Sequence, residues 1–316
     1  MAPLPESRLP LQSPPFSNTG VDYFGPMQVK RGRGTEKRWV CLFTCLTTRA
    51  IHLELVASLE TNSFILALRR FASRRGSPLT MTSDNGTNFR GADRELKEAV
   101  AALDHTNIAD TLATKGIKWN FNPPEGPHFG GVWERLVRSV KTTLRVILGN
   151  STYREDVLHT ALTEAESIIN SRPLTALSDS PVDYEALSPN HFLIGSQNPQ
   201  TPPDVPAPNH LNYRKYWQHA QILADHFWQR FQKEYLPELQ RRHKWTTSKR
   251  NLRPNDLVLV PSDDQPRCQW KLGRIIKTLP GKDNKVRVVE IRTSAGVYTR
   301  PVAKLCLLEE ATDPNV

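Results

Sequence analysis

Few cysteines and no long apolar run occur in the 316-residue sequence. The four cysteines are Cys41, Cys45, Cys268 and Cys306. They form no Cys-x-x-Cys pair and have no histidine at zinc-ligand spacing, so we expect reduced, mostly buried thiols and not a zinc site. No stretch approaches the ~18 apolar residues of a membrane span, and residues 1–16 contain no signal-peptide apolar segment. These absences predict a soluble, intracellular protein with no membrane partner.

The charge of the chain is basic and unevenly distributed. The sequence has 42 Lys and Arg against 32 Asp and Glu, a formal net charge of +10. Residues 241–316 hold sixteen basic and eight acidic residues, so 16 − 8 = +8 of this charge lies in the last quarter. A basic tail on a near-neutral body predicts a separate module that grips DNA or RNA. Its basic side chains, Lys271 and Arg274 among them, would contact phosphates without reading base sequence.

Apolar periodicity predicts an α/β domain in the first half of the chain. Three successive strands, typical of a meander, are expected at 16–29, 39–48 and 51–56. Beyond them we expect a helix at 62–73, a short strand at 79–83 ending at Asp84, a helix at 92–103, a strand at 117–122 and a long helix after Gly131.

The second half of the chain reads as helices followed by short strands. Thr152 and Glu155 have the spacing of a capping box, ahead of helical periodicity at 156–170. Short β-rich runs after Pro254 predict a small barrel. The predicted organisation is an extended arm at 1–14, a catalytic core at 15–176, a Pro-rich linker at 177–210, a long helical segment at 211–250, a basic β-barrel-like domain at 251–310 and a tail at 311–316.

Three acidic residues form the candidate site. Asp22 lies on a strand between aromatic residues, Asp84 follows a strand at an Asn-Gly turn, and Glu134 lies near the start of the long helix. Taken singly, each acid suits a structural role, such as turn chemistry for Asp84. Taken together, two strand carboxylates and a helix carboxylate can hold two Mg²⁺ or Mn²⁺ ions about 4 Å apart. Such a site would support phosphodiester cleavage or transfer.

A basic stripe follows Glu134 along its helix. Arg138, Lys141 and Arg145 come four, seven and eleven residues later, which keeps them on the face of Glu134. The apolar residues expected on the other face are Leu136, Val137, Val140, Leu144, Ile147 and Leu148. A solvated face with a Glu-to-Arg pair is the alternative explanation. Because the stripe starts at the proposed metal site, a DNA backbone entering that site would run along it.

Three blocks, VDYFG, TSDNGTNF and NPPEGPHFGGVWERLVRSVK, resemble the catalytic blocks of the retroviral-type integrase core. The form of these blocks is similar to that in the integrases of Pao/BEL long-terminal-repeat retrotransposons. Further matches to that group are TTRAIHLEL, INSRPLT and LSPNHFLIG. The stretch from PNDLVLV to TRPVAKLCLLE resembles the C-terminal domain of the same group. The resemblance covers about residues 14–309. It implies an α/β, RNase H-like mixed-sheet core, a helical linker and a small SH3-like β-barrel.

The same resemblance implies the roles of particular residues. Asp22, Asp84 and Glu134 would be the catalytic DDE triad and would bind two Mg²⁺ or Mn²⁺ ions. Asn85 and Gly86 match residues after the second acid, Arg138 and Lys141 match basic positions that the family uses against the DNA end, and Arg145 continues the same stripe, so all five are expected to lie against DNA. His128 matches the family's loop before the third acid and could position substrate, with a role in the turn as the alternative. Water would trim the DNA 3′ end, and the freed 3′ hydroxyl would then attack target DNA. The implied partners are double-stranded DNA, both element ends and target, and further copies of the chain, in the nucleus.

Two features depart from the family's pattern. The second and third acids are separated by 134 − 84 − 1 = 49 residues, more than in retroviral cores. Glu125 lies nearer the usual spacing, but it falls in a Pro- and Gly-rich loop, so Glu134 is preferred. No His-His-Cys-Cys zinc module precedes Asp22. An alternative is therefore a host-adopted, catalytically silent DNA-binding or scaffold protein, and a third is an RNase H or junction resolvase.

Two further residues, His52 and Trp270, are candidates for a functional role. His52, in IHLEL, is expected to be structural. Trp270, in the β-rich tail, is expected to pack in a core, with base stacking as the alternative.

Overall fold

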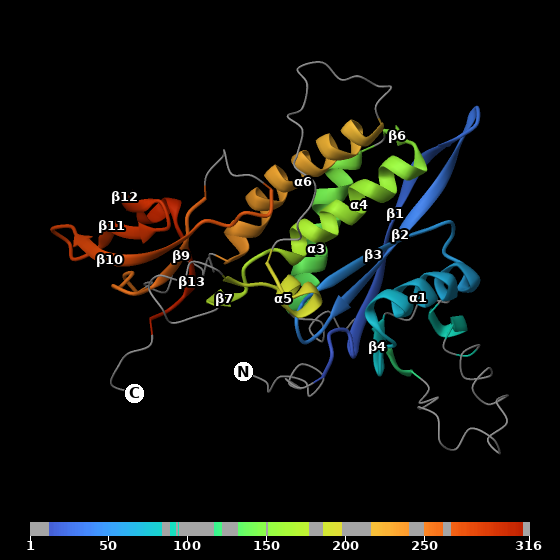
Figure 1. Cartoon of the computed structure of the whole chain (residues 1–316), viewed down its shortest axis with the longest axis horizontal. Helices are drawn as coiled ribbons and strands as arrows, with labels where there is room; N and C mark the ends of the chain where they lie inside the picture. Colours follow the sequence, from blue (N-terminus) through green and yellow to red (C-terminus); the bar gives the residue numbers. More distant parts are fainter. Residues whose placement is uncertain are drawn as a thin grey trace. The chain divides into compact units, whose positions relative to one another are not determined.

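The architecture is given by a computed structural model (Figure 1). The structure describes residues 13–83, 89–92, 94, 117–121, 132–149, 151–176, 186–197, 216–239, 250–261 and 267–311. The chain divides into two compact units, one of residues 1–166 with 206–224 and the other of residues 167–205 with 225–316. The domain boundaries expected from sequence stay a prediction.

The first unit is built on one mixed β-sheet. Its strands are β1 (Asn18–Arg31), β2 (Gly34–Cys45), β3 (Ile51–Val56), β4 (Thr80–Ser83), β5 (Lys118–Phe121) and β6 (Thr152–Tyr153). The spatial order is β3-β2-β1-β4-β5, with β6 beside β1. β1, β2 and β3 pair antiparallel, whereas β4 pairs parallel with β1 and β5 parallel with β4. The predicted meander is confirmed, and the sheet is the mixed one of an RNase H-like fold.

The long β1–β2 hairpin has a two-residue turn. Arg31 pairs with Gly34, and Gly32 between them has a φ of +59°. Glycine adopts this left-handed conformation at little cost, and the turn's twist matches that of the flanking strands. β1 therefore ends two residues beyond the strand predicted at 16–29.

Three described helices accompany this sheet: α1 (Thr61–Arg75), α3 (Val132–Leu148) and α4 (Glu155–Asn170). They confirm the helices predicted at 62–73, after Gly131 and at 156–170. The core beneath α1 is aromatic. Phe43 of β2 stacks on Phe71 of α1 with ring centroids 4.2 Å apart, and both rings are fully buried. The helix predicted at 92–103 lies almost entirely outside the described residues.

The capping box predicted at Thr152 and Glu155 is wrong. Thr152 is in β6, where it pairs with Gln28 of β1, and α4 begins only at Glu155. The Glu155 carboxylate accepts a hydrogen bond from Arg38 Nε at 3.0 Å. Sheet pairing and this ion pair therefore take the two groups that the capping box would have used.

The second unit contains a five-stranded antiparallel sheet of spatial order β12-β11-β10-β9-β13. Its strands are β9 (Leu257–Leu259), β10 (Leu272–Pro280), β11 (Val286–Thr293), β12 (Gly296–Pro301) and β13 (Cys306–Glu309). Other described elements are the two-stranded pair β7 (Thr175–Ala176) and β8 (Ala186–Leu187), and α5 (Pro189–Ile194). The expected small β domain is confirmed, with a core that includes Val258, Ile275 and Val289.

Trp270 joins this β domain to helix α6 (Tyr216–Leu239). Its ring meets Trp228 edge-on at 4.8 Å and Tyr235 at 5.8 Å, and only 8% of Trp270 is exposed. The expectation that Trp270 packs in a core is confirmed. A base has no access to this ring, so the stacking alternative is excluded.

All four cysteines are free, and Cys268 is the one that is not buried. Burial raises the pKa of the Cys41 thiol well above its ordinary value, so this group is neutral. Across the described residues, none of the helices has both the length and the apolar character needed to cross a membrane.

Candidate active site and nucleic-acid-binding surfaces

Asp22 lies on β1, the central strand of the sheet, which pairs with β2 on one side and with β4 on the other. It sits opposite Leu42 of β2, and its side chain is 32% exposed. One carboxylate oxygen, Oδ1, accepts a hydrogen bond from the backbone N–H of Tyr23 at 2.7 Å. The other, Oδ2, forms an ion pair with Nζ of Lys141 on α3. The carboxylate is thus held in one orientation by a rigid strand.

Strand β4 brings the second acidic block toward this point. Thr82 pairs with Gly20, so Ser83, the last residue of β4, is level with Val21 of β1. Ser83 is fully buried, and its hydroxyl accepts a hydrogen bond from Trp119 Nε1 at 2.9 Å. Asp84 follows Ser83 directly in the chain. Asp84, together with Asn85 and Gly86, lies outside the described residues.

The far end of this block is anchored by an aromatic residue that sequence reasoning missed. Phe89 is 2% exposed, and its ring stacks on Tyr23 with centroids 5.4 Å apart. It also meets Phe64 of α1 edge-on at 5.0 Å. Both residues that flank positions 84–88 are therefore buried, one of them against the neighbour of Asp22. The signal available in the sequence was the aromatic residue that closes TSDNGTNF.

Helix α3 presents the basic stripe as predicted. Arg138 and Arg145 are exposed, and Lys141 is half-buried against Asp22. The buried residues on the other side are Leu136, Val137, Val140, Leu144 and Leu148. Glu134 is in the first turn of α3, seven residues before Lys141, which is about two helical turns. The side chain of Glu134, and His128, lie outside what the structure describes.

Asp22 offers a carboxylate oxygen as a ligand for a divalent cation. The described residues contain no group of three or more His, Cys, Asp or Glu side chains, and Asp22 is the one predicted ligand whose side chain is among them. Its Oδ2 is ion-paired with the ammonium of Lys141. A half-exposed carboxylate is an oxygen ligand of the kind that Mg²⁺ prefers.

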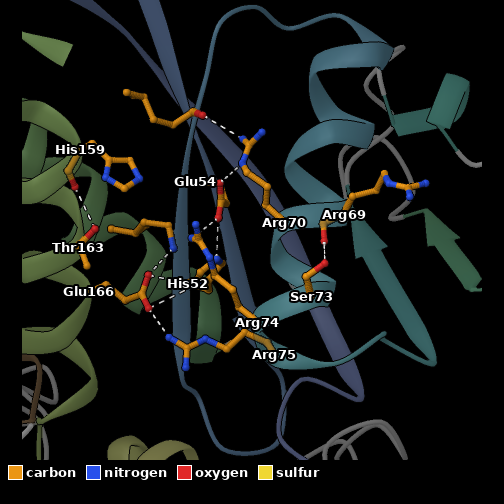
Figure 2. Close-up of polar contacts among 12 residues, drawn as sticks. His52, Glu54, Arg69, Arg70, Ser73, Arg74, Arg75, His159, Thr163 and Glu166 are labelled. Carbon is orange, nitrogen blue, oxygen red and sulfur yellow. Dashed lines mark hydrogen bonds and ion pairs between the residues drawn. The ribbon is translucent and has the colours of Figure 1, made fainter. Parts of the chain in front are cut away.

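A separate cluster of buried charges surrounds His52 on β3 (Figure 2). His52 is 3% exposed and lies between two carboxylates: Nε2 is 3.1 Å from Glu54 Oε1, and Nδ1 is 3.2 Å from Glu166 Oε2. A neutral imidazole carries one N–H and could donate to one of them only. Two flanking carboxylates therefore favour the imidazolium, and the expectation that His52 is structural is confirmed.

Three arginines of α1 complete the cluster. Arg70 Nε and Arg74 Nη1 donate to Glu54 at 2.6 and 2.8 Å, and Arg75 Nη2 donates to Glu166 at 2.6 Å (Figure 2). These contacts tie α1 and α4 to β3. On the outer edge of β3, Glu166 accepts from the backbone N–H of Leu53 at 2.8 Å and Arg70 Nη2 donates to the carbonyl of Leu55 at 3.2 Å. These two backbone groups of the edge strand are therefore not available for pairing with another chain.

The charges shift one another's pKa values. Burial alone would lower the pKa of His52, but hydrogen bonds with Glu166 and Glu54 outweigh it and raise that pKa. For Glu54, burial alone would raise the pKa, whereas hydrogen bonds from His52 and Arg70 lower it. The pKa of Glu166 is likewise lowered, against the effect of burial, by the hydrogen bond and charge of His52. All three shifts favour the charged forms.

The β domain carries cations on its outer surface. Arg274 of β10 lies directly opposite Arg292 of β11, and both neighbour core residues, so they point to the face away from the core. Lys271 and Arg300 lie 5.0 and 5.5 Å from the ring centroid of Tyr298. Like charges directly opposite each other destabilise a sheet. Arg274 also donates a hydrogen bond to the backbone carbonyl of Asn255 at 3.3 Å. Arg292, Arg300 and Tyr298 were not predicted from sequence.

We expect this face to contribute to the salt dependence of DNA binding. Arg274→Ala and Arg292→Ala should each lower the slope of log affinity against log salt concentration by about 1, since each removes about one phosphate contact. Binding to a short DNA duplex, measured by fluorescence anisotropy at several salt concentrations, gives the slope. Arg287→Ala is the matched control, because Arg287 is paired with Asp283 at 2.7 Å. Equal slopes for all three variants would contradict the assignment.

Comparisons with known proteins add a partial family match. A family model described as "Family of unknown function (DUF5641)" matches residues 215–308. This range spans α6 and nearly all of the β domain, which is consistent with the packing of Trp270 against Trp228 and Tyr235. No curated protein matches the chain.

Among solved structures, similarity is found to viral integrases. A chain in the cryoEM structure of the simian T-cell lymphotropic virus intasome in complex with PP2A regulatory subunit B56 gamma is 15% identical, over 96% of this chain and 81% of that chain, with a TM-score of 0.40. The HTLV-2 integrase catalytic core domain in complex with magnesium, in its trimeric form, is 16% identical over 57% of this chain and 97% of that chain, with a TM-score of 0.36. Its dimeric form is 16% identical over 50% and 88%, with a TM-score of 0.32. At these scores the similarity carries no argument about activity.

Proposed function

We propose that the protein is an integrase of the retrotransposon type, which trims the 3′ ends of double-stranded DNA and joins them to target DNA. The observation that carries the proposal is the contact of Asp22 with α3 and its position next to the end of β4. Strand β4 ends at Ser83, which is level with Val21 and directly precedes Asp84, and α3, which carries Glu134, contacts Asp22 through Lys141. The strand and the helix that lead to the other two acidic residues thus lie beside the strand that carries Asp22.

Each predicted site residue has a proposed part in the reaction. Asp22, Asp84 and Glu134 would hold two Mg²⁺ or Mn²⁺ ions, which when bound would activate the attacking oxygen and stabilise the leaving one. Asn85, Gly86 and His128 would lie against the DNA end. Arg138, Lys141 and Arg145 would bind the backbone phosphates along α3, and the cations of the β domain would bind phosphates farther away.

The order of chemical steps follows from this arrangement. A carboxylate site that binds an oxygen nucleophile can first take water, which cleaves a phosphodiester near the DNA 3′ end. The freed 3′ hydroxyl can then take the place of water and attack a phosphate of target DNA. Neither step requires a covalent bond between DNA and the protein, so a single set of carboxylates serves both. As part of the proposal, the protein acts in the nucleus as a homo-oligomer.

The direct test is an end-joining assay with a branched DNA substrate. The wild-type protein with Mn²⁺ should give nicked and joined products, and Asp84→Asn should give neither. Products are separated on a denaturing gel and followed over time. If the wild-type protein gives no metal-dependent product, the integrase proposal fails.

A second candidate function is a host-adopted DNA-binding or scaffold protein that keeps the fold without the chemistry. It is favoured by the cationic surface of the β domain, where Arg274 and Arg292 can bind DNA without any metal. The two candidates are distinguished by DNA affinity and product formation measured on the same samples. For a scaffold, affinity is independent of Mg²⁺ and of Asp84, and no product forms.

A further inference from the structure

We propose that Lys141 is a positioning residue that couples cation binding at Asp22 to the capture of DNA phosphate. In the structure its ammonium is ion-paired with Asp22 Oδ2, so one side chain links the predicted metal ligand to the predicted DNA-binding helix. When a divalent cation binds Asp22, the ammonium is displaced and becomes available to a phosphate. This inference rests on the proposed function and adds a linkage between its two ligands.

The position of Lys141 on α3 supports displacement toward DNA. Lys141 lies three residues after Arg138 and four before Arg145, so the three cations are neighbours along one face. Arg138 and Arg145 are exposed, and Lys141 turns to Asp22 instead. Released from Asp22, its ammonium would complete a row of three cations along a phosphate backbone. The flexible four-carbon side chain of lysine allows this movement without a change in the helix.

The ion pair is of the kind that opens readily. The side chains of Lys141 and Asp22 are 21% and 32% exposed. An ion pair in contact with water contributes little net stability, in contrast to the buried pairs of His52. A divalent cation carries twice the charge of the ammonium and takes carboxylate oxygens as direct ligands. It also repels the ammonium, so both effects favour exchange.

A thermodynamic consequence follows from this exchange. If a cation bound at Asp22 raises the affinity for DNA by releasing Lys141, then bound DNA must raise the affinity for the cation by the same factor. We expect a coupling factor of about 10 between the two ligands, within the range typical of linked sites. A lysine with a purely structural role would show no such linkage.

The test measures DNA affinity with and without cation. A short blunt DNA duplex is titrated with wild-type protein in EDTA and in Ca²⁺, a hard cation that carboxylate oxygens also bind. We expect Ca²⁺ to tighten DNA binding about 10-fold for the wild type and at most about 2-fold for Lys141→Met. Arg138→Met is the matched control: it should weaken binding by a similar factor in both buffers and retain the Ca²⁺ effect. Lys141→Arg should retain it as well, which also shows that the site tolerates substitution.

Calorimetry with Mn²⁺ alone separates this inference from the proposed function. Lys141→Met should bind Mn²⁺ severalfold more tightly than the wild type, because no ammonium competes for Asp22. If the wild type binds Mn²⁺ and forms joined product, but Lys141→Met keeps the full Ca²⁺ effect on DNA affinity, the coupling is overturned and the integrase proposal stands. If the wild type binds no Mn²⁺, both are overturned.

Discussion

Replacing Asp22 with Asn is expected to reduce metal-dependent DNA cleavage by about 10³-fold or more. A carboxylate that holds catalytic ions contributes several kcal/mol of transition-state stabilisation, and each ~1.4 kcal/mol corresponds to a factor of ten in rate. Asn has nearly the same shape as Asp and its Oδ1 can still accept from the backbone N–H of Tyr23. Strand β1 should therefore keep its pairing with β2 and β4. The single-turnover cleavage rate of a DNA end with Mn²⁺ is the measurement.

The control for this substitution is Asp156→Asn on α4. Asp156 has a 58% exposed side chain paired with Arg154, so it tests the loss of a carboxylate with no role at the site. Its cleavage rate should equal that of the wild type.

DNA binding in EDTA should be unchanged or tighter in Asp22→Asn, because Lys141 loses its carboxylate partner. If Asp22→Asn cleaves DNA at the wild-type rate, Asp22 is not a catalytic residue.

Glu54→Gln is expected to lower the free energy of unfolding by about 1–3 kcal/mol, the typical cost of removing one partner from a buried hydrogen-bonded group. The cost is below that of a fully buried ion pair because the side chains of Arg70 and Arg74 are 40% and 51% exposed, so water compensates them in part. Glu54 is 2% exposed and neutralises His52, Arg70 and Arg74. An amide in its place carries no charge, so His52 keeps Glu166 as its one carboxylate partner and the two arginines lose theirs. The matched control is Glu36→Gln on β2, with a 45% exposed side chain, where a loss of about 0–1 kcal/mol is expected because Arg38 keeps Glu155. Urea denaturation gives both values.

The pH dependence of unfolding tests the same cluster independently. The pKa of His52 is raised above 6.5, so its stabilisation is complete below pH 6.5 and is lost as the pH rises through the folded-state value. The pKa of Glu54 is lowered below 4.5, so its stabilisation is present above pH 4.5 and is lost as the pH falls through the folded-state value. The cluster should therefore stabilise the wild type most between about pH 4.5 and 6.5.

In Glu54→Gln the decline above pH 6.5 should be shallower, because His52 keeps only Glu166 as a partner and its pKa falls. Denaturation series at pH 5.5 and pH 8 measure this difference. An identical pH profile in wild type and variant would show that His52 does not titrate in this range.

The described strands and helices were largely predictable from local patterns, and the composition of the site stays a prediction. Alternation around Asp22, the apolar run of β2 and the helical period of α3 each reflect whether a side chain faces core or solvent, and that choice leaves a periodic trace in the sequence. The buried face of α3, with Val140 fully buried, was therefore anticipated correctly. Where a tertiary partner competes with a local motif, prediction failed, as at Thr152, which pairs in the sheet instead of capping α4.

Pairings between distant residues were not predictable in this way. Lys141 and Asp22 are 119 residues apart in sequence, and Glu166 is 114 from His52. Arg274 and Arg292 face each other because of the register of β10 and β11, and a shift of one residue would send either side chain to the core face. Register and helix docking depend on the whole core, so no local pattern records them.

The sequence by itself determined the acidic blocks, the basic helix, the cationic tail and the order of strands and helices, because these depend on residue type and on spacing within one element. Only the tertiary structure decided that Asp22 is held by Lys141, that His52 is buried between two carboxylates, and that Phe89 anchors the second block on Tyr23. The physical reason is that the energy of a charge or a ring depends on what surrounds it in space, and those surroundings come from residues far away in the chain.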